Sequence, residues 1–147
     1  VLVFCKEVGI EFKNNKSIDT SIKVLQDSSS NWGFQLEKCC GQFNNKDNYF
    51  LSEEAFLNFI PISKEEYRGK DVLVAGAGFG REIGHVARYF CKNIFAIDIS
   101  SSIYIAQKNC SSFSNVHFVM ADIMNLPFSS KFDIVLSDHV LQHLPNV

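Results

Sequence analysis

Three glycines stand at alternate positions in residues 76–80, which read Gly-Ala-Gly-Phe-Gly and follow the apolar run 72–75. Glycine adopts positive φ without steric cost and has no side chain, so a ligand can approach the backbone closely. Amides at the start of a following helix would then face an anionic group. The pattern predicts a strand, a ligand-binding loop and a helix, with a tight turn that binds nothing as the alternative.

Two carboxylates follow later apolar runs and suit the recognition of a nucleoside. Asp98 comes about twenty residues after the glycine loop, where a carboxylate can accept hydrogen bonds from both hydroxyls of a ribose. Asp122 can accept from an exocyclic adenine amine while the Ile123 amide faces a ring nitrogen. The alternatives are a strand-end or capping acid for Asp98, and a loop acid or helix N-cap for Asp122.

The spacing of the glycines bears on which nucleoside cofactor is expected. The dinucleotide fingerprint G-x-G-x-x-G requires glycine at position 81, but the chain has Arg81 and reads G-x-G-x-G. A side chain therefore stands where helix and sheet would close around a pyrophosphate. This disfavours an NAD-type site, although the glycine loop and Asp98 alone do not distinguish NAD from another cofactor that contains adenosine.

The elements that must position these residues alternate between strand and helix patterns. Apolar runs at 72–75, 94–97, 116–120 and 132–137 have the length of buried parallel strands. Helical spacing follows the first run through Cys91, with Ile83, Val86, Ala87 and Phe90 on one side, and the second from Ser100 or Ser101 to Asn109. Right-handed βαβ units of this kind predict an α/β fold, a Rossmann-like, doubly wound, mostly parallel sheet with ligands beyond its carboxyl ends.

The chain divides into a polar N-terminal part, residues 1–49, and the alternating region, residues 50–147. The first part is a flanking segment and linker with two small strands predicted at 1–4 and 8–12. A helix after Ser52 is predicted to place Phe56, Phe59 and Ile60 on one face before Pro61 ends it. A capping pattern at 63–66 predicts one more helical turn. The sheet is expected to be incomplete, as in a segment of a longer protein.

Composition excludes several classes of function. Fourteen Lys and Arg against sixteen Asp and Glu give a net charge of −2, so no basic field favours nucleic acid. No apolar run is long enough to span a bilayer or begin a signal peptide, which predicts a cytoplasmic protein without membrane contact. The five cysteines include no C-x-x-C pair, so free thiols are expected rather than disulfides or zinc.

Residues 72–81, 95–100, 115–128 and 132–145 together resemble the successive motifs of class I S-adenosylmethionine-dependent methyltransferases. The resemblance runs from Lys70 to the end of the chain. It implies that the glycine loop holds the methionine part of S-adenosyl-L-methionine, with the ribose at Asp98 and the adenine at Asp122. Ser137 and Asp138 would border the methyl group. The cofactor-binding residues so predicted are Gly76, Ala77, Gly78, Gly80, Asp98, Ile99, Asp122, Ile123 and Ser137.

Some residues depart from the family pattern or carry no assigned role. Val74 stands where the family usually has an acid that orients the methionine end. His139 and His143 lie four apart on the helix expected after the fourth strand, and a role in helix packing or solvent exposure is preferred over a base or metal ligand. His85 and His117 are expected to be structural. No catalytic residue and no metal are predicted.

Methyl transfer is an in-line displacement, for which the protein aligns a nucleophile with the methyl group and excludes water. The sequence therefore predicts a methyltransferase whose acceptor is unidentified and is expected to be a small molecule. Two alternatives stay open: an NAD(P)-binding oxidoreductase domain, and an adenosyl-binding remnant without catalytic activity.

Overall fold

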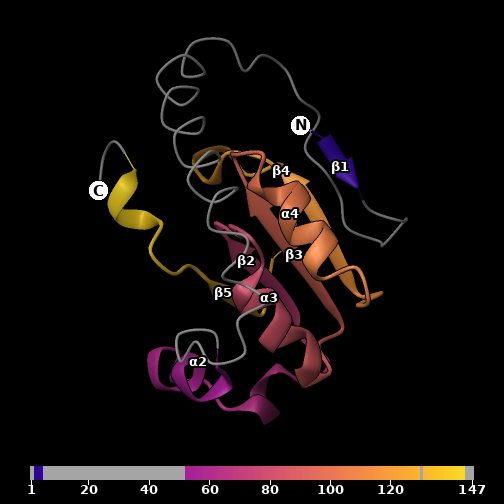
Figure 1. Cartoon of the computed structure of the whole chain (residues 1–147), viewed down its shortest axis with the longest axis vertical. Helices are drawn as coiled ribbons and strands as arrows, with labels where there is room; N and C mark the ends of the chain where they lie inside the picture. The colour runs from indigo at the N-terminus through magenta and orange to yellow at the C-terminus, as the bar shows by residue number, and fades with distance from the viewer. Residues whose placement is uncertain (1, 5–51, 130, 145–147) are drawn as a thin grey trace.

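The computed structural model describes residues 2–4, 52–129 and 131–144. Its sheet has the strand order β1-β4-β3-β2-β5 (Figure 1). The strands are β1 (Leu2–Phe4), β2 (Asp71–Ala75), β3 (Asn93–Asp98), β4 (Val116–Met120) and β5 (Ile134–Leu136). β1 pairs antiparallel with β4, and the other pairings are parallel. This confirms the predicted Rossmann-like, doubly wound, mostly parallel sheet.

The direction of winding reverses at β2. The chain runs outward from β2 through β3 to β4 and then returns to place β5 on the opposite side of β2. Val74 accordingly pairs with Ala96 of β3 on one side and with Leu136 of β5 on the other. In doubly wound sheets, ligands bind in a crevice at the carboxyl ends of the strands where the winding reverses.

Helices cover one face of the sheet: α2 (Glu53–Phe59), α3 (Arg81–Val86) and α4 (Ser102–Asn109), with the short 3-10 helices η3 (Lys64–Tyr67) and η4 (Ala87–Tyr89). Since side chains alternate along a strand, every second residue of β2 and β3 points to this layer. Val72, Val74 and Ala96 are buried there against Ile83 and Ile103 of the helices. The capping box predicted at 63–66 is present at the start of η3.

The opposite face of the sheet packs on an aromatic cluster. Phe95 of β3 lies 5.5 Å from Phe128 and 5.7 Å from Phe132, measured between ring centroids. His117 of β4 is buried and stacks on Phe95 at 4.8 Å. His85 is also buried and stacks on Phe56 across the helical layer. Both histidines therefore pack in the core, as predicted.

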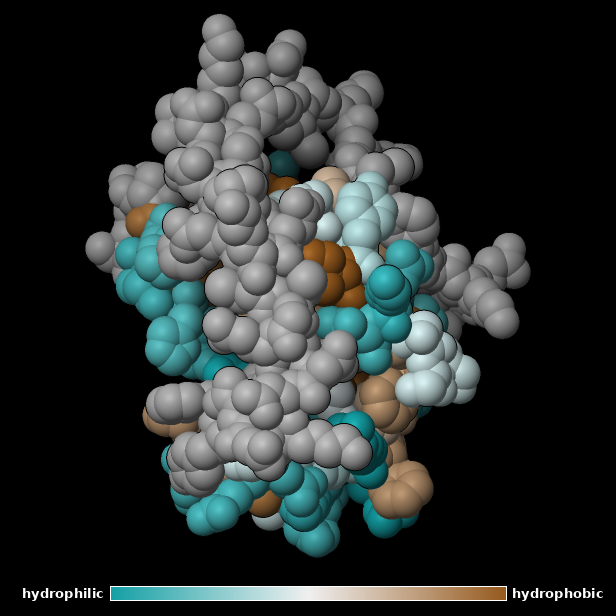
Figure 2. All heavy atoms as spheres, viewed as in Figure 1, coloured by the Kyte–Doolittle hydropathy of each residue, from teal (hydrophilic) through white to brown (hydrophobic). Residues whose placement is uncertain are grey.

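Two phenylalanines that were predicted on the apolar faces of helices are exposed. The exposed fraction of Phe59, the last residue of α2, is 60%, whereas Phe56 of the same helix is buried against His85 and Tyr89. Phe90 is 69% exposed, because the helix α3 ends at Val86. The 3-10 helix η4 follows, and the chain then turns to positive φ at Phe90. Figure 2 shows hydrophilic side chains predominating among the described residues on the face it presents, with scattered hydrophobic ones.

The segment after β5 also differs from its prediction. β5 is shorter than the predicted strand at 132–137, and the expected helix bearing His139 and His143 is wrong. His139 has φ of +54°, which an α-helix does not accommodate, and within the residues described up to Leu144 it is followed by the 3-10 helix η6 (Leu141–His143). Pro145 in the sequence disfavours a helical conformation at Leu144, which is extended.

Several further predictions concern residues outside the described ranges. The first predicted strand coincides with β1, while the second, at 8–12, and most of the flanking segment lie outside the described ranges.

Among the described residues no helix is long and apolar enough to cross a membrane, and no cluster of potential metal ligands occurs. Of the cysteines, Cys91 and Cys110 are described, and both are free and buried.

Candidate functional site

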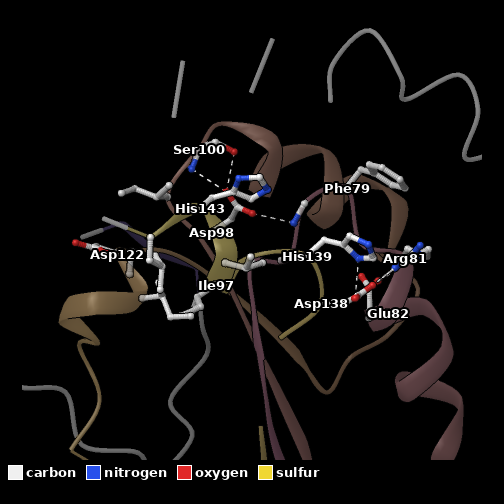
Figure 3. Close-up of a pocket in the computed structure, with 18 of the residues that line it drawn as sticks. Phe79, Arg81, Glu82, Ile97, Asp98, Ser100, Asp122, Asp138, His139 and His143 are labelled. Carbon is white, nitrogen blue, oxygen red and sulfur yellow. Dashed lines mark hydrogen bonds and ion pairs between the residues drawn. The ribbon is translucent and has the colours of Figure 1, made fainter. Parts of the chain in front are cut away.

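The carboxyl ends of the four parallel strands meet at one cavity of about 630 Å³ (Figure 3). Its walls are four segments of the chain, one at the carboxyl end of each of the strands β2, β3, β4 and β5. These segments contribute Gly76–Phe79, Ile97–Ser100, Ala121–Ile123 and Asp138–Val140. The size is ordinary for a site that binds a small molecule or cofactor, since such pockets span roughly 300–1,000 Å³.

The glycine loop is held against β3 by its backbone. The amides of Gly76 and Ala77 both donate to the Ile97 carbonyl, at 2.9 and 2.8 Å. Gly76 and Gly78 have φ of +84° and +51°, the left-handed region that favours glycine. A Cβ at Gly76 would also come within 2.1 Å of the Val140 side chain. The loop after β5 therefore packs directly on the glycine loop.

Asp98 ties the glycine loop to the end of β3. Its carboxylate accepts from the Gly78 amide at 2.8 Å and from the Ser100 amide and hydroxyl at 2.8 and 2.7 Å. The Ser100 hydroxyl is itself 2.6 Å from that of Ser102, and both serines are buried. Figure 3 shows Asp98 between Ser100 and the glycine loop. A carboxylate has about four acceptor positions, so Asp98 retains room for a ligand hydroxyl.

Asp122 is a helix N-cap, the alternative considered for it from the sequence, and it also lies at the cavity. Its Oδ1 accepts from the Met124 amide at 2.8 Å and so caps the 3-10 helix η5 (Ile123–Asn125). The same residue, with Ile123, lines the cavity wall that β4 provides. The cap fixes the carboxylate in place without removing it from the cavity.

A chain of ionic contacts, which we call the ionic chain, lies along the wall of the cavity between α3 and the segment after β5. Arg81 of α3 contacts Glu82 and Asp138, and Asp138 Oδ1 lies 2.7 Å from Nδ1 of His139. Burial by itself lowers the pKa of Arg81, but Glu82 and Asp138 together raise it above its ordinary value. Figure 3 shows Asp138 between Arg81 and His139. The chain thus connects the helix after β2 with the loop after β5.

The structure brings seven of the nine predicted cofactor-binding residues to this cavity and leaves two outside its lining. Gly80 caps α3 at φ of +98°, and a Cβ there would lie 3.1 Å from Cys110 Sγ. The Ser137 hydroxyl is buried without a hydrogen-bond partner among the described residues. Val74 packs in the helical layer of the core. The seven residues on the cavity are Gly76, Ala77, Gly78, Asp98, Ile99, Asp122 and Ile123.

Other lining residues were not predicted from the sequence. Arg81 and Glu82 adjoin the glycine loop, so their proximity to that loop was a usable signal. Phe59 reaches the cavity from α2, which precedes the first strand of the parallel sheet, and no sequence motif indicated it. His139 and His143 line the cavity from the segment after β5, where a packing or solvent-exposed role was preferred.

Comparison with known proteins identifies one family. A family model described as a methyltransferase domain matches residues 73–147, which is more than half of the chain. The match begins within β2 and includes the glycine loop, Asp98, Asp122 and the segment after β5. No curated protein matches the chain.

Many solved structures share the fold, and two of them illustrate the likeness. The DhpI–SAH complex matches with a TM-score of 0.63 and 21% identity, over 86% of this chain and 59% of that one. Protein arginine methyltransferase 10 of Arabidopsis thaliana matches with a TM-score of 0.58 and 16% identity, over 74% of this chain and 31% of that one. The chain spans less than two thirds of the length of either protein.

Proposed function

This chain belongs to the methyltransferase domain family, and we propose that it binds S-adenosyl-L-methionine in the cavity and transfers the methyl group to a small-molecule acceptor. One observation carries this proposal: Gly78, Asp98 and Asp122, from three strand ends, line the same cavity. Separate cavities for these residues would have argued against an adenosyl ligand.

The groups present fit that cofactor. Glycine at positive φ leaves open backbone, and the carboxylates of Asp98 and Asp122 can accept from ribose hydroxyls and an adenine amine. Four carboxylate side chains line the cavity against a single arginine, which favours a positively charged ligand. When bound, the cofactor supplies a methyl group activated by its positively charged sulfur.

Each wall of the cavity receives a role in this proposal. Gly76 to Gly78 hold the methionine part, Asp98 the ribose, and Asp122 with the Ile123 amide the adenine, while Ile99 packs beside the nucleoside. Asp138, across the cavity on the ionic chain with Arg81, borders the acceptor. The protein's contribution is to orient two reactants in line and to exclude water.

Apolar side chains at the cavity support a small acceptor. Phe59, Val140 and Leu144 line it, and no basic surface follows from the net charge of −2. A protein acceptor is the alternative raised by the fold shared with an arginine methyltransferase. Free thiols at Cys91 and Cys110 agree with the cytoplasmic location that we include in the proposal.

Titration calorimetry with S-adenosylhomocysteine and with NADH tests the cofactor. We expect Asp98→Ala to weaken S-adenosylhomocysteine binding by on the order of 2–4 kcal/mol, because charge-assisted hydrogen bonds are lost. Asp133→Ala is the matched control, since Asp133 binds the Asp71 amide at the amino ends of the strands. Tighter binding of NADH, or an unchanged dissociation constant for Asp98→Ala, would contradict the proposed site.

A turnover assay separates the enzyme from an adenosyl-binding remnant. Val74, where the family usually has an acid, is the feature that favours a remnant, and it lies in the core. Formation of S-adenosylhomocysteine with a pool of small acceptors supports the enzyme. Tight cofactor binding without turnover on any acceptor pool supports the remnant.

A further inference from the structure

We propose that His139 is the general base that removes the proton from the methyl acceptor, and that this acceptor is an apolar molecule bearing an aromatic hydroxyl. The inference rests on the proposed function, because it assumes methyl transfer in the cavity. It goes beyond that function by assigning a catalytic residue and an acceptor class.

The position of His139 is set by its neighbour in the chain. Val140 packs on Gly76 so closely that a Cβ on the glycine would overlap it. This contact fixes the loop after β5 against the loop proposed to hold the methionine part of the cofactor. His139, adjacent to Val140, therefore lines the cavity on the side of the sulfur rather than that of the adenine, which is proposed at Asp122.

Asp138 orients the imidazole for proton transfer. An ionised carboxylate only accepts hydrogen bonds, so Nδ1 of His139 donates to Asp138 Oδ1 across 2.7 Å. In the neutral imidazole with this tautomer, Nε2 carries no proton and can accept one, after which Asp138 stabilises the imidazolium. Arg81 of α3, which is also paired with Glu82, holds Asp138 in place, and the His139 side chain is 75% exposed and accessible to an acceptor.

The backbone at His139 supports a functional role. A φ of +54° is uncommon for a residue with a side chain, and such conformations are energetically costly and cluster at functional sites. A glycine here would remove that cost but also the imidazole. The conformation turns the chain between β5 and η6 and so places His139 at the cavity. The helix predicted from the sequence would have continued through this position instead.

The surrounding side chains favour an aromatic acceptor. Phe59, Phe79, Val140 and Leu144 line the cavity, and Phe59 is exposed although nothing in its helix requires an exposed phenyl ring. Rings of this kind pack on another ring and shield it from water. A phenolic hydroxyl keeps its proton at neutral pH, having a pKa of about 10, and so needs a base as its oxygen reacts.

The step balances without another reactant. The phenolic O–H bond breaks as its proton moves to His139 Nε2, and the oxygen forms a bond to the methyl carbon. The bond between that carbon and sulfur breaks, and its electron pair stays on sulfur, which becomes a neutral thioether. The products are a methyl ether and S-adenosylhomocysteine, and His139 returns its proton to solvent.

The test compares two acceptors of the same shape, 4-methylphenol and 4-methylbenzenethiol, in mildly alkaline buffer where the aryl thiol is already ionised. We expect His139→Gln to lower kcat/KM for the phenol by on the order of 10²–10⁴-fold, and to lower that for the thiol far less. Asp138→Asn should give the same pattern with a smaller loss, as a positioning residue. Asp133→Ala should leave both rates unchanged.

Three outcomes separate the assignments. Equal losses with both acceptors would show that the ring only shapes the cavity, and would overturn the role of base. Failure of the wild-type protein to methylate the phenol while it binds S-adenosylhomocysteine would overturn the acceptor class. Failure of the wild-type protein to bind S-adenosylhomocysteine would instead overturn the proposed function.

Discussion

At the scale of single residues, Gly76 is subject to two separate constraints. Its φ is +84°, and a Cβ would meet the Val140 side chain at 2.1 Å. Gly69 shares the first constraint, with φ of +70°, but has no atom within 4 Å of its Cβ position. The two glycines therefore allow the backbone strain and the steric overlap to be measured separately.

We expect Gly69→Ala to lower the free energy of unfolding by about 1–2 kcal/mol, the cost of a left-handed alanine. Gly76→Ala should lower it by more and should also weaken the binding of S-adenosylhomocysteine, because Val140 and the loop after β5 must move. Urea denaturation and titration calorimetry measure the two effects. Equal destabilisation by the two variants would show that the Val140 contact is easily relieved.

His117 should make the stability depend on mildly acidic pH. Burial lowers its pKa below the ordinary 6.5, so the unfolded chain binds the proton more readily than the folded one. The contribution of the neutral His117 to the free energy of unfolding is therefore complete above pH 6.5 and is lost as the pH falls below that value. His117→Phe should keep the packing on Phe95 and reduce this loss, as measured by urea midpoints on either side of 6.5.

Sequence reasoning reached residues whose types and chain positions carry the signal. Gly76, Gly78, Asp98 and Asp122 follow buried strands, and a parallel sheet brings such positions together. His139 was not assigned, because its place depends on a positive φ that no motif in the sequence indicates. The roles of all these residues in binding stay predictions.

At the scale of elements, α2 carries two phenylalanines with opposite environments. Phe56 is 6% exposed and packs on His85 and Tyr89, whereas Phe59, one turn later, is 60% exposed at the cavity. We expect Phe56→Ala to cost about 3–5 kcal/mol of stability. Phe59→Ala should stay within about 0.5 kcal/mol, as for surface substitutions, and should instead raise KM for the acceptor.

Denaturation curves and steady-state kinetics of both variants check this division of roles. A large loss of stability for Phe59→Ala would place its ring in the core. An unchanged KM would remove it from the acceptor site. The identity of its neighbours could not be read from the helix alone, since spacing predicts a shared face but not which residues the next element covers.

Strands were predicted more accurately than helices, for a physical reason. β2, β3 and β4 are buried along most of their length on both faces, so they appear as largely apolar runs in the sequence, whereas Val135 of β5 is 59% exposed. The helix α3 ends at Val86 and is followed by the 3-10 helix η4 and the left-handed Phe90, so the apolar spacing continues past the end of the α-helix. Helix ends thus depend on contacts that a single sequence does not display.

At the scale of the whole molecule, one ligand should tie together four distant segments. S-adenosylhomocysteine at about one hundred times its dissociation constant should stabilise the fold by about 2.7 kcal/mol. Hydrogen exchange should slow in residues 76–80, 98–100, 121–123 and 138–144, at the carboxyl ends of the strands. Amides at the amino ends, such as those of Asp71 and Asn93, serve as the internal control. Protection confined to the glycine loop would contradict a shared cavity.

The return of β5 to the open side of β2 has a consequence for protein synthesis. As a nascent chain leaves the ribosome, β2, β3 and β4 can associate in the order in which they emerge, while one edge of β2 stays without its partner. That edge is covered only when Ile134 to Leu136 arrive, and the cavity gains its fourth wall only with the residues after them. Translation must therefore have passed residue 144 before all the residues that line the cavity have been synthesised.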